Sequence, residues 1–141
     1  MNAARIFLMA IVCGLCCGCA EQSSGKLIDA AAVTVMPKPW PRPAVTTASA
    51  PRILALWMNE TTIPSGSDWD GRAITTTNVA SLEIRTESFS FIAQRTAFGD
   101  FRFHQHVLDM VPYYKRNYLL HVIARNAAGD RDEWLVPIQF R

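Results

Sequence analysis

The alternation of apolar and polar positions between residues 51 and 141 predicts β-strands rather than helices. Ser81–Glu87 alternates strictly, which is typical of a strand with one buried face. The same two-residue period runs through Phe101–Val107 and Tyr118–Asn126. Further strands are expected at 52–58, 71–77, 89–91 and 134–140. About seven strands in about ninety residues, with turn signals between them and no convincing amphipathic helix, predict an all-β sandwich.

The stretch before this domain, residues 19–50, predicts a flexible Pro-rich tether. Proline occupies every second position from Pro37 to Pro43, which blocks sheet pairing and favours extended polyproline II. Leu27–Met36 is weakly apolar and fits one strand, a helical turn or neither. A tether of this composition would reach up to about 100 Å from a membrane. The expected boundaries are therefore 1–18, 19–50 and 51–141.

The first nineteen residues have the three parts of an export signal. A positive start at Arg5 precedes an apolar stretch of about ten residues, too short to span a bilayer. Gly18 then supplies a small residue before Cys19, and all four cysteines of the chain lie at 13, 16, 17 and 19. The segment resembles a bacterial lipoprotein signal peptide, with residues 1–18 removed and Cys19 lipidated. Ordinary secretion with cleavage near residues 18–20 is the alternative.

This resemblance implies a protein held in the bacterial cell envelope by a lipid anchor, which is stable when two or more acyl chains are attached. Ala20 follows the cysteine, which implies the outer membrane if the cell has two membranes; without lipidation the protein would be secreted or periplasmic. Removal of residues 1–18 takes away Arg5 alone and leaves 13 Lys and Arg against 12 Asp and Glu. This near-neutral balance does not indicate nucleic-acid binding. The mature chain keeps one cysteine and therefore no internal disulfide.

The closing third of the chain carries a more specific pattern. Tyr118 opens an alternating apolar stretch that ends in Ala124-Arg125-Asn126-Ala127-Ala128-Gly129. This resembles the last two strands of an immunoglobulin-like or fibronectin type III domain. The resemblance implies that the Tyr118 hydroxyl hydrogen-bonds back to the preceding corner, and that Asn126 and Gly129 form a turn with positive φ. It implies a fold and a bias towards binding or spacing, and no particular chemistry.

The histidines predict no metal centre and no cofactor. His104 and His106 lie two apart on one strand face and point outward from one sheet. His121 points outward from the other sheet, so the three side chains are not expected to meet.

One acidic segment offers a calcium candidate. Asp68-Trp69-Asp70-Gly71 resembles a fragment of a calcium loop, and its plain alternative is an ordinary acidic turn. Asp109 is the further carboxylate that a sandwich topology would bring towards Asp68 and Asp70.

No catalytic residue is expected, so the protein is predicted not to be an enzyme. The sequence contains no G-x-S-x-G, no H-E-x-x-H and no phosphate-binding glycine loop. Leu119, His121 and Ile123 face outward on the longest strand, and an apolar outer stripe is unusual for an isolated monomer. The stripe is therefore the candidate partner surface, unless Leu27–Val35 or Trp40 folds back over it.

The expected function is a lipid-anchored envelope module for protein binding or assembly, with an unidentified envelope protein as partner and no nucleic acid. A carbohydrate-binding module for wall or surface glycans is the alternative, which exposed, coplanar tryptophans would favour. A small hydrolase or metal-dependent enzyme is the third reading and would need a pocket with converging polar groups.

Overall fold

The computed structural model describes residues 25–46 and 50–141, in which strands dominate. They are β1 (Lys26–Leu27), β2 (Ile53–Met58), β3 (Thr62–Ile63), β4 (Asp68–Thr75), β5 (Val79–Arg85), β6 (Ser90–Ile92), β7 (Gln94–Ala97), β8 (Asp100–His106), β9 (Asn117–Asn126) and β10 (Arg131–Phe140). A five-residue helix, α1 (Ala30–Thr34), and a 3₁₀ turn at Pro112–Tyr114 complete the elements of these residues.

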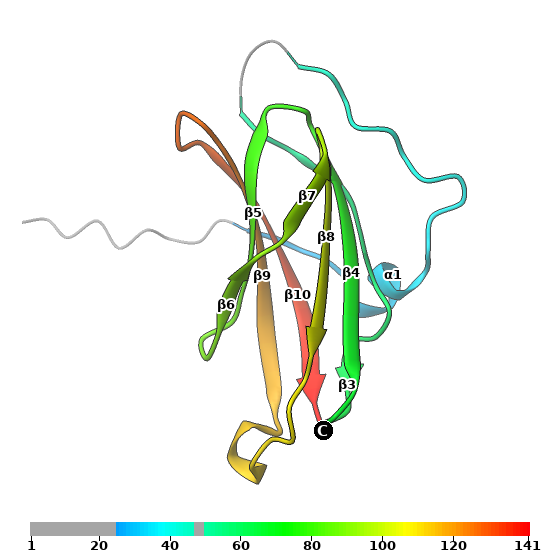
Figure 1. Cartoon of the computed structure of the whole chain (residues 1–141), viewed down its shortest axis with the longest axis vertical. Helices are drawn as coiled ribbons and strands as arrows, with labels where there is room; N and C mark the ends of the chain where they lie inside the picture. The colour runs from blue at the N-terminus through cyan, green and yellow to red at the C-terminus, as the bar shows by residue number, and fades with distance from the viewer. Residues whose placement is uncertain (1–24, 47–49) are drawn as a thin grey trace, which may run out of the picture.

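The strands form two sheets that face each other (Figure 1). One sheet has the order β1-β10-β9-β5-β6, with the short β3 lying parallel to the end of β10. The other has the order β2-β4-β8-β7. The all-β class is therefore confirmed. Each stretch expected to be a strand contains one, and β1, β3 and β7 were not expected, which gives ten strands in the part of the chain described here.

Trp69 lies at the centre of the core, and the aromatic residues between the sheets gather around it. Its ring centroid is 5.0 Å from that of Phe103, and 6.1–6.4 Å from those of Phe89, Phe91 and Phe140. The indole Nε1 donates to the backbone oxygen of Glu60 at 3.2 Å. Residues 68–71 are thus the beginning of β4 and not an acidic turn, because the alternation that turns Trp69 inward continues through them.

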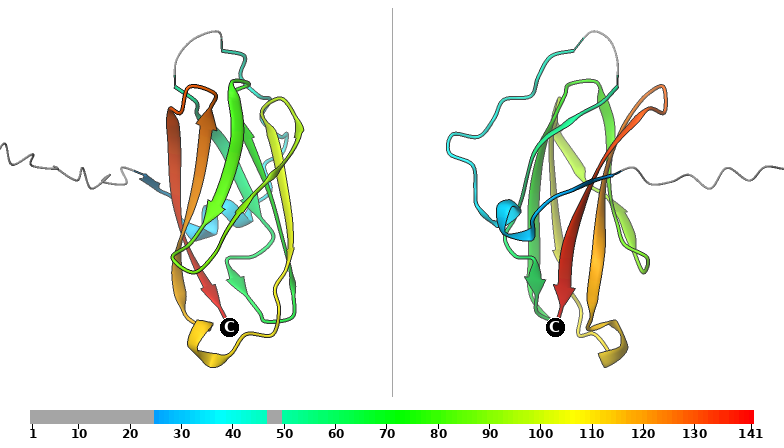
Figure 2. Two further views of the ribbon diagram at one scale, coloured as in Figure 1. Left: turned by 60° about the vertical axis from the view of Figure 1, so that its left-hand side comes forward. Right: turned by 180° about the vertical axis from the view of Figure 1, so that it is seen from behind.

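Residues 25–46 pack on the sandwich, which corrects the expectation of a flexible tether for this part of 19–50 (Figure 2). Val33 of α1 is buried within the core cluster, and α1 contacts both β2 and β10. The proline-rich stretch then loops outward and returns to the sandwich at Pro43 and Ala44 (Figure 2). Thr77 N–H donates to the oxygen of Ala44 at 3.0 Å, and Pro43 lies against Gly99. An extended proline segment needs no ladder hydrogen bonds of its own, so it can cover a sheet face.

The predicted signal peptide, 1–18, and Cys19 lie outside the described residues. In residues 25–46 and 50–141, no helix is both long and apolar enough to cross a membrane.

The corner and the turn predicted from the closing third are both present. The Tyr118 hydroxyl donates to the backbone oxygen of Tyr114 at 3.1 Å, which ties the start of β9 to the crossover before it. In the β9–β10 turn Gly129 has a φ of 91°, and the Asn126 side chain accepts from Asp130 N–H at 2.9 Å. The hydrogen bond of Tyr118 and the positive φ of Gly129 are therefore confirmed.

Candidate functional site

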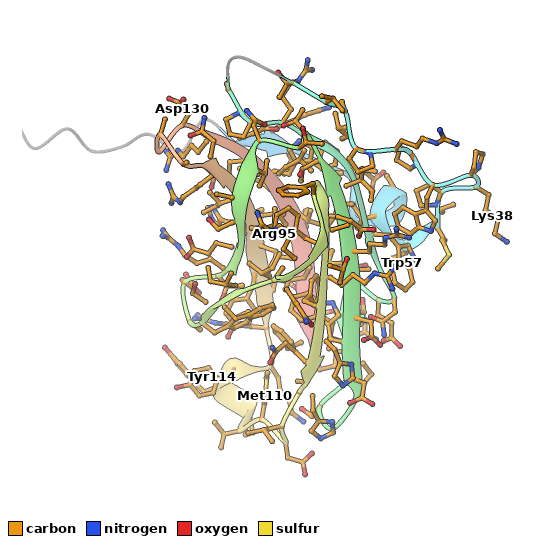
Figure 3. All side chains as sticks on the ribbon, turned by 45° about the horizontal axis from the view of Figure 1, so that its top comes forward. Lys38, Trp57, Arg95, Met110, Tyr114 and Asp130 are labelled. Carbon is orange, nitrogen blue, oxygen red and sulfur yellow. The ribbon has the colours of Figure 1, made fainter. Side chains whose placement is uncertain are left out.

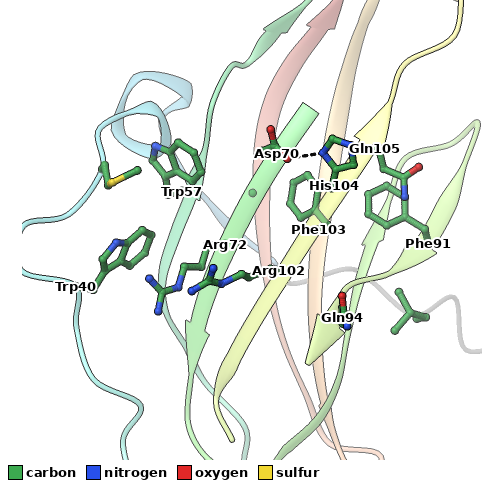
Figure 4. Close-up of a pocket in the computed structure, with 13 residues that line it drawn as sticks. Trp40, Trp57, Asp70, Arg72, Phe91, Gln94, Arg102, Phe103, His104 and Gln105 are labelled. Carbon is green, nitrogen blue, oxygen red and sulfur yellow. Dashed lines mark hydrogen bonds and ion pairs between the residues drawn. The ribbon is translucent and has the colours of Figure 1, made fainter. Parts of the chain in front are cut away.

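A groove of about 620 Å³ extends from the outer face of the β2-β4-β8-β7 sheet over β8 to Phe91 of β6 in the other sheet (Figure 4). The alternation of β4 and β8 turns Trp69 and Phe103 into the core. The polar residues that alternate with them along each strand therefore face outward. Those polar residues form the floor: Asp70, Arg72, Arg102 and His104. Trp57 of β2 and Trp40 of the proline-rich segment form one side, and Phe91, Gln94 and Gln105 form the other.

Arg72 connects the Trp40 side of the groove to its floor. Its Nε donates to Asp100 Oδ1 at 3.0 Å and its Nη2 donates to Asp100 Oδ2 at 2.5 Å, which makes a bidentate ion pair. The hydrogen bonds that Arg72 donates to Asp100 raise the pKa of the guanidinium above its ordinary value. The same guanidinium lies 4.4 Å from the centre of the Trp40 ring, a cation–π contact. Trp40 is thereby held over the sheet, although its own segment has no strand pairing there.

Arg102 is the second guanidinium of the floor and is far less engaged. Its Nε lies 3.9 Å from Asp100 Oδ1, the carboxylate that already binds Arg72, and its side chain is 56 % exposed. One carboxylate therefore serves two guanidiniums. The floor consequently keeps an accessible positive charge at Arg102.

Two histidine–aspartate pairs lie side by side on β4 and β8. His104 Nδ1 is 2.7 Å from Asp70 Oδ1, and His106 Nδ1 is 2.8 Å from Asp68 Oδ1. The pairs occupy alternate rungs of the antiparallel ladder, on one face, with the Trp69–Gln105 rung between them, and all four side chains are exposed or partly so. The hydrogen bond to Asp70 raises the pKa of His104, and the hydrogen bond to His106 lowers the pKa of Asp68.

The calcium candidate does not come together as a site. Asp68 and Asp70 are engaged by histidines, and Asp109 lies beside the Gly66 turn. Across residues 25–46 and 50–141, no three or more His, Cys, Asp or Glu side chains are arranged to hold a metal ion. His104 and His106 lie on one sheet and His121 on the other, as the strand alternation predicted.

The predicted partner stripe is not an exposed apolar surface. Leu119 is 41 % exposed, but Ile123 is only 2 % exposed. In register, Ile123 is flanked by Glu83 of β5 and Glu133 of β10, so it faces outward yet lies between long side chains. His121 is partly buried and its Nδ1 lies 2.5 Å from Glu133 Oε1.

The covering expected from residues 27–35 or Trp40 lies elsewhere. Leu27 of β1 is exposed at the sheet edge beyond β10, and Trp40 lies on the opposite sheet over Arg72. Sequence reasoning missed the groove because Trp40 belongs to the segment taken for a tether. A lone tryptophan among prolines, together with charged outward positions on two strands, was the available signal.

No protein-family model matches the chain, and no curated protein matches it. Among solved structures, the chain is similar to a superoxide reductase (neelaredoxin) from Ignicoccus hospitalis. The sequence identity is 12 %, the TM-score is 0.40, and the alignment covers 82 % of this chain and 94 % of that one. A similarity at this level gives no argument about function.

Proposed function

We propose that this protein is a membrane-anchored bacterial envelope lipoprotein whose sandwich is a non-enzymatic binding module, with a glycan as ligand in the groove. The observation that carries the proposal is the pairing of Trp40 and Trp57 with a polar floor on one open sheet face. The groove volume of about 620 Å³ lies within the usual range for ligand sites.

The composition of the groove suits a sugar polymer. Both tryptophans are partly exposed, and an indole face is a flat apolar surface against which the C–H face of a sugar ring can stack. Gln94 and Gln105 lie across the groove with amides that donate and accept hydrogen bonds, as hydroxyl groups require. An open groove also admits a chain that continues at both ends. The other two tryptophans of the chain, Trp69 and Trp134, pack in or against the core.

An immunoglobulin-like topology is part of the proposal. Two features support it: the β2-β4-β8-β7 and β10-β9-β5-β6 pairings match the two-sheet division of such domains, and Tyr118 forms the corner hydrogen bond. Sandwiches of this kind commonly serve as binding or spacing units.

The anchor rests on the sequence around Cys19. From Cys19 to Gly25, where the described part begins, the chain advances by six residues, which can span at most about 20 Å. Because residues 25–46 pack on the sandwich, a lipidated Cys19 would hold the domain close to the membrane. This replaces the long reach expected of a tether.

The test is binding of the full chain to a panel of soluble and insoluble polysaccharides. Trp57→Ala should weaken retention by about tenfold, because stacking of a ligand ring on an aromatic side chain contributes about 1–3 kcal/mol. Tyr113→Ala is the matched control, since it removes an exposed aromatic ring far from the groove and should leave retention unchanged. Lack of retention on every polysaccharide, or equal retention of the Trp57 variant, would reject the proposal.

A protein partner remains the second candidate, and a different surface favours it. The crossover between β8 and β9 exposes Leu108, Val111 and Tyr113 beside an apolar cleft of about 320 Å³. Figure 3 places Met110 of this crossover and Tyr114 together at one end of the molecule, away from Asp130. Exposed apolar patches commonly mark protein contacts. Crosslinking in the native membrane should then yield one partner that Leu108→Ser and Val111→Ser together remove; a partner retained by that variant rules this surface out.

A further inference from the structure

Positive side chains gather around the groove, and this excess bears on which glycan it takes. Arg72 and Arg102 lie on the floor, and Lys38 and Arg42 flank Trp40 in the sequence and are exposed. Arg95 of β7 is also exposed, but it pairs with the inward-facing Phe101 and its guanidinium lies 5.2 Å from the centre of the Phe98 ring, so it is not one of the groove residues. Figure 3 shows Lys38 and Trp57 on the same side of the molecule.

The acidic residues of the same surface are already engaged. Asp100 is held by the bidentate contact with Arg72 and is only 14 % exposed, so it offers Arg102 no close partner. Asp70 is held at 2.7 Å by His104. The groove therefore presents Arg102 to solvent as a guanidinium whose nearest carboxylate lies 3.9 Å away and is shared.

A guanidinium binds a carboxylate through two parallel N–H donors, which makes Arg102 a specific donor site for that group rather than a diffuse charge. The tryptophan side and the guanidinium floor adjoin, because Arg72 contacts Trp40 and pairs with Arg102 across β4 and β8. A sugar ring over the indoles could thus place an attached carboxylate on the floor.

We infer that the ligand of the groove is an acidic polysaccharide of the polyuronate class, with sugar rings on Trp40 and Trp57 and a carboxylate on Arg102. This rests on the proposed function, which it makes more specific. The whole protein has a formal net charge of only +2, so the preference comes from the local arrangement and not from bulk charge.

The experiment measures binding of the full chain to polygalacturonate and to the same polymer with its carboxyls methyl-esterified. We expect the acid form to bind at least about tenfold more tightly, in line with one charge-assisted contact. Arg102→Gln should weaken binding of the acid form by about tenfold and leave the ester form unchanged, since only the charge contact is lost. Arg85→Gln is the matched control, because Arg85 is an exposed arginine of β5 on the other sheet.

Two further arms separate the possible failures. Polyglutamate carries carboxylates without sugars, and binding as tight as that of polygalacturonate would overturn the polyuronate inference. Equal binding of the acid and ester forms, both weakened about tenfold by Trp57→Ala, would overturn the acidic preference and leave glycan binding intact. Binding of neutral polysaccharides but not of polygalacturonate or alginate would also overturn the acidic preference and leave glycan binding intact. Failure with every polysaccharide would overturn both.

Discussion

The contact between Gly71 and Phe103 gives the sharpest test of how the groove floor is joined to the core. Both residues lie at paired positions of β4 and β8, and the Phe103 ring lies across the glycine. A Cβ at position 71 would be 2.1 Å from one ring carbon of Phe103 and 2.2 Å from another, whereas an ordinary contact is 3.4–4 Å. The Phe103 ring would have to move by more than 1 Å. The ring centroids of Trp69 and Phe91 lie 5.0 and 5.5 Å from its own, so these rings stand close to it.

Gly71→Ala should therefore destabilise the protein by about 2 kcal/mol. Overpacking of a dense core costs about 1–3 kcal/mol, and the reduced entropy of the unfolded chain offsets about 0.5 kcal/mol of that. Urea unfolding followed by circular dichroism should show a midpoint lower by about 1 M at an unchanged slope.

A double-mutant cycle identifies the cause. Phe103→Leu alone should cost roughly 1–2 kcal/mol through lost ring volume, but in combination with Gly71→Ala the loss should be smaller than the sum by at least about 1 kcal/mol. Gly129→Ala is the control, because in residues 25–46 and 50–141 no atom beyond its chain neighbours lies within 4 Å of its Cβ position, and its φ of 91° makes the cost conformational. Its effect should add to that of Phe103→Leu. A Gly71→Ala variant as stable as the parent, or additive with Phe103→Leu, would refute the contact.

Three further predictions concern the corner, the surface pairs and the anchor. Tyr118→Phe removes the hydrogen bond to the Tyr114 oxygen and should lower the free energy of unfolding by about 1 kcal/mol. The melting temperature should fall by about 4–8 °C. An unchanged melting temperature would show that this hydrogen bond does not stabilise the fold. Because Asp70 raises the pKa of His104 above 6.5, the stabilisation from this pair is full below pH 6.5 and is lost as the pH rises through the folded-state pKa. The urea midpoint of the parent should thus exceed that of His104→Gln at pH 6 and converge with it by pH 9, and a gap that widens with pH would contradict the assignment. Cys19→Ser should abolish lipid addition in intact-mass analysis and move the protein out of the detergent phase, whereas unchanged partitioning would argue against the anchor.

The strands could be predicted from the sequence because their information is local. The alternation of Phe101–His106 and Tyr118–Ala124 fixes which side chains enter the core without knowledge of any partner strand. The places of Tyr118 at the corner and Gly129 in the turn came instead from the resemblance of the closing third to an immunoglobulin-like or fibronectin type III domain.

The groove could not be predicted in this way, because it depends on contacts between segments far apart in the sequence. The pairing of Asp70 with His104 is a matter of register between β4 and β8, which neither strand encodes alone. Trp40 contacts the site through Arg72, so a proline-rich stretch with the composition of a linker contributes a ring to the groove. Ile123 faces outward as its position dictates, but its burial depends on Glu83 and Glu133 beside it.

The indole resonances of the chain test the central claim most directly, because the four tryptophans divide cleanly between groove and core. In an ¹⁵N-labelled sample titrated with oligogalacturonate, the Nε1–H signals of Trp40 and Trp57 should shift, since both rings line the groove. Those of Trp69 and Trp134 should stay in place, because these rings pack in or against the core. Binding that leaves the Trp40 and Trp57 signals unmoved, or no shift with any glycan tested, would contradict the account.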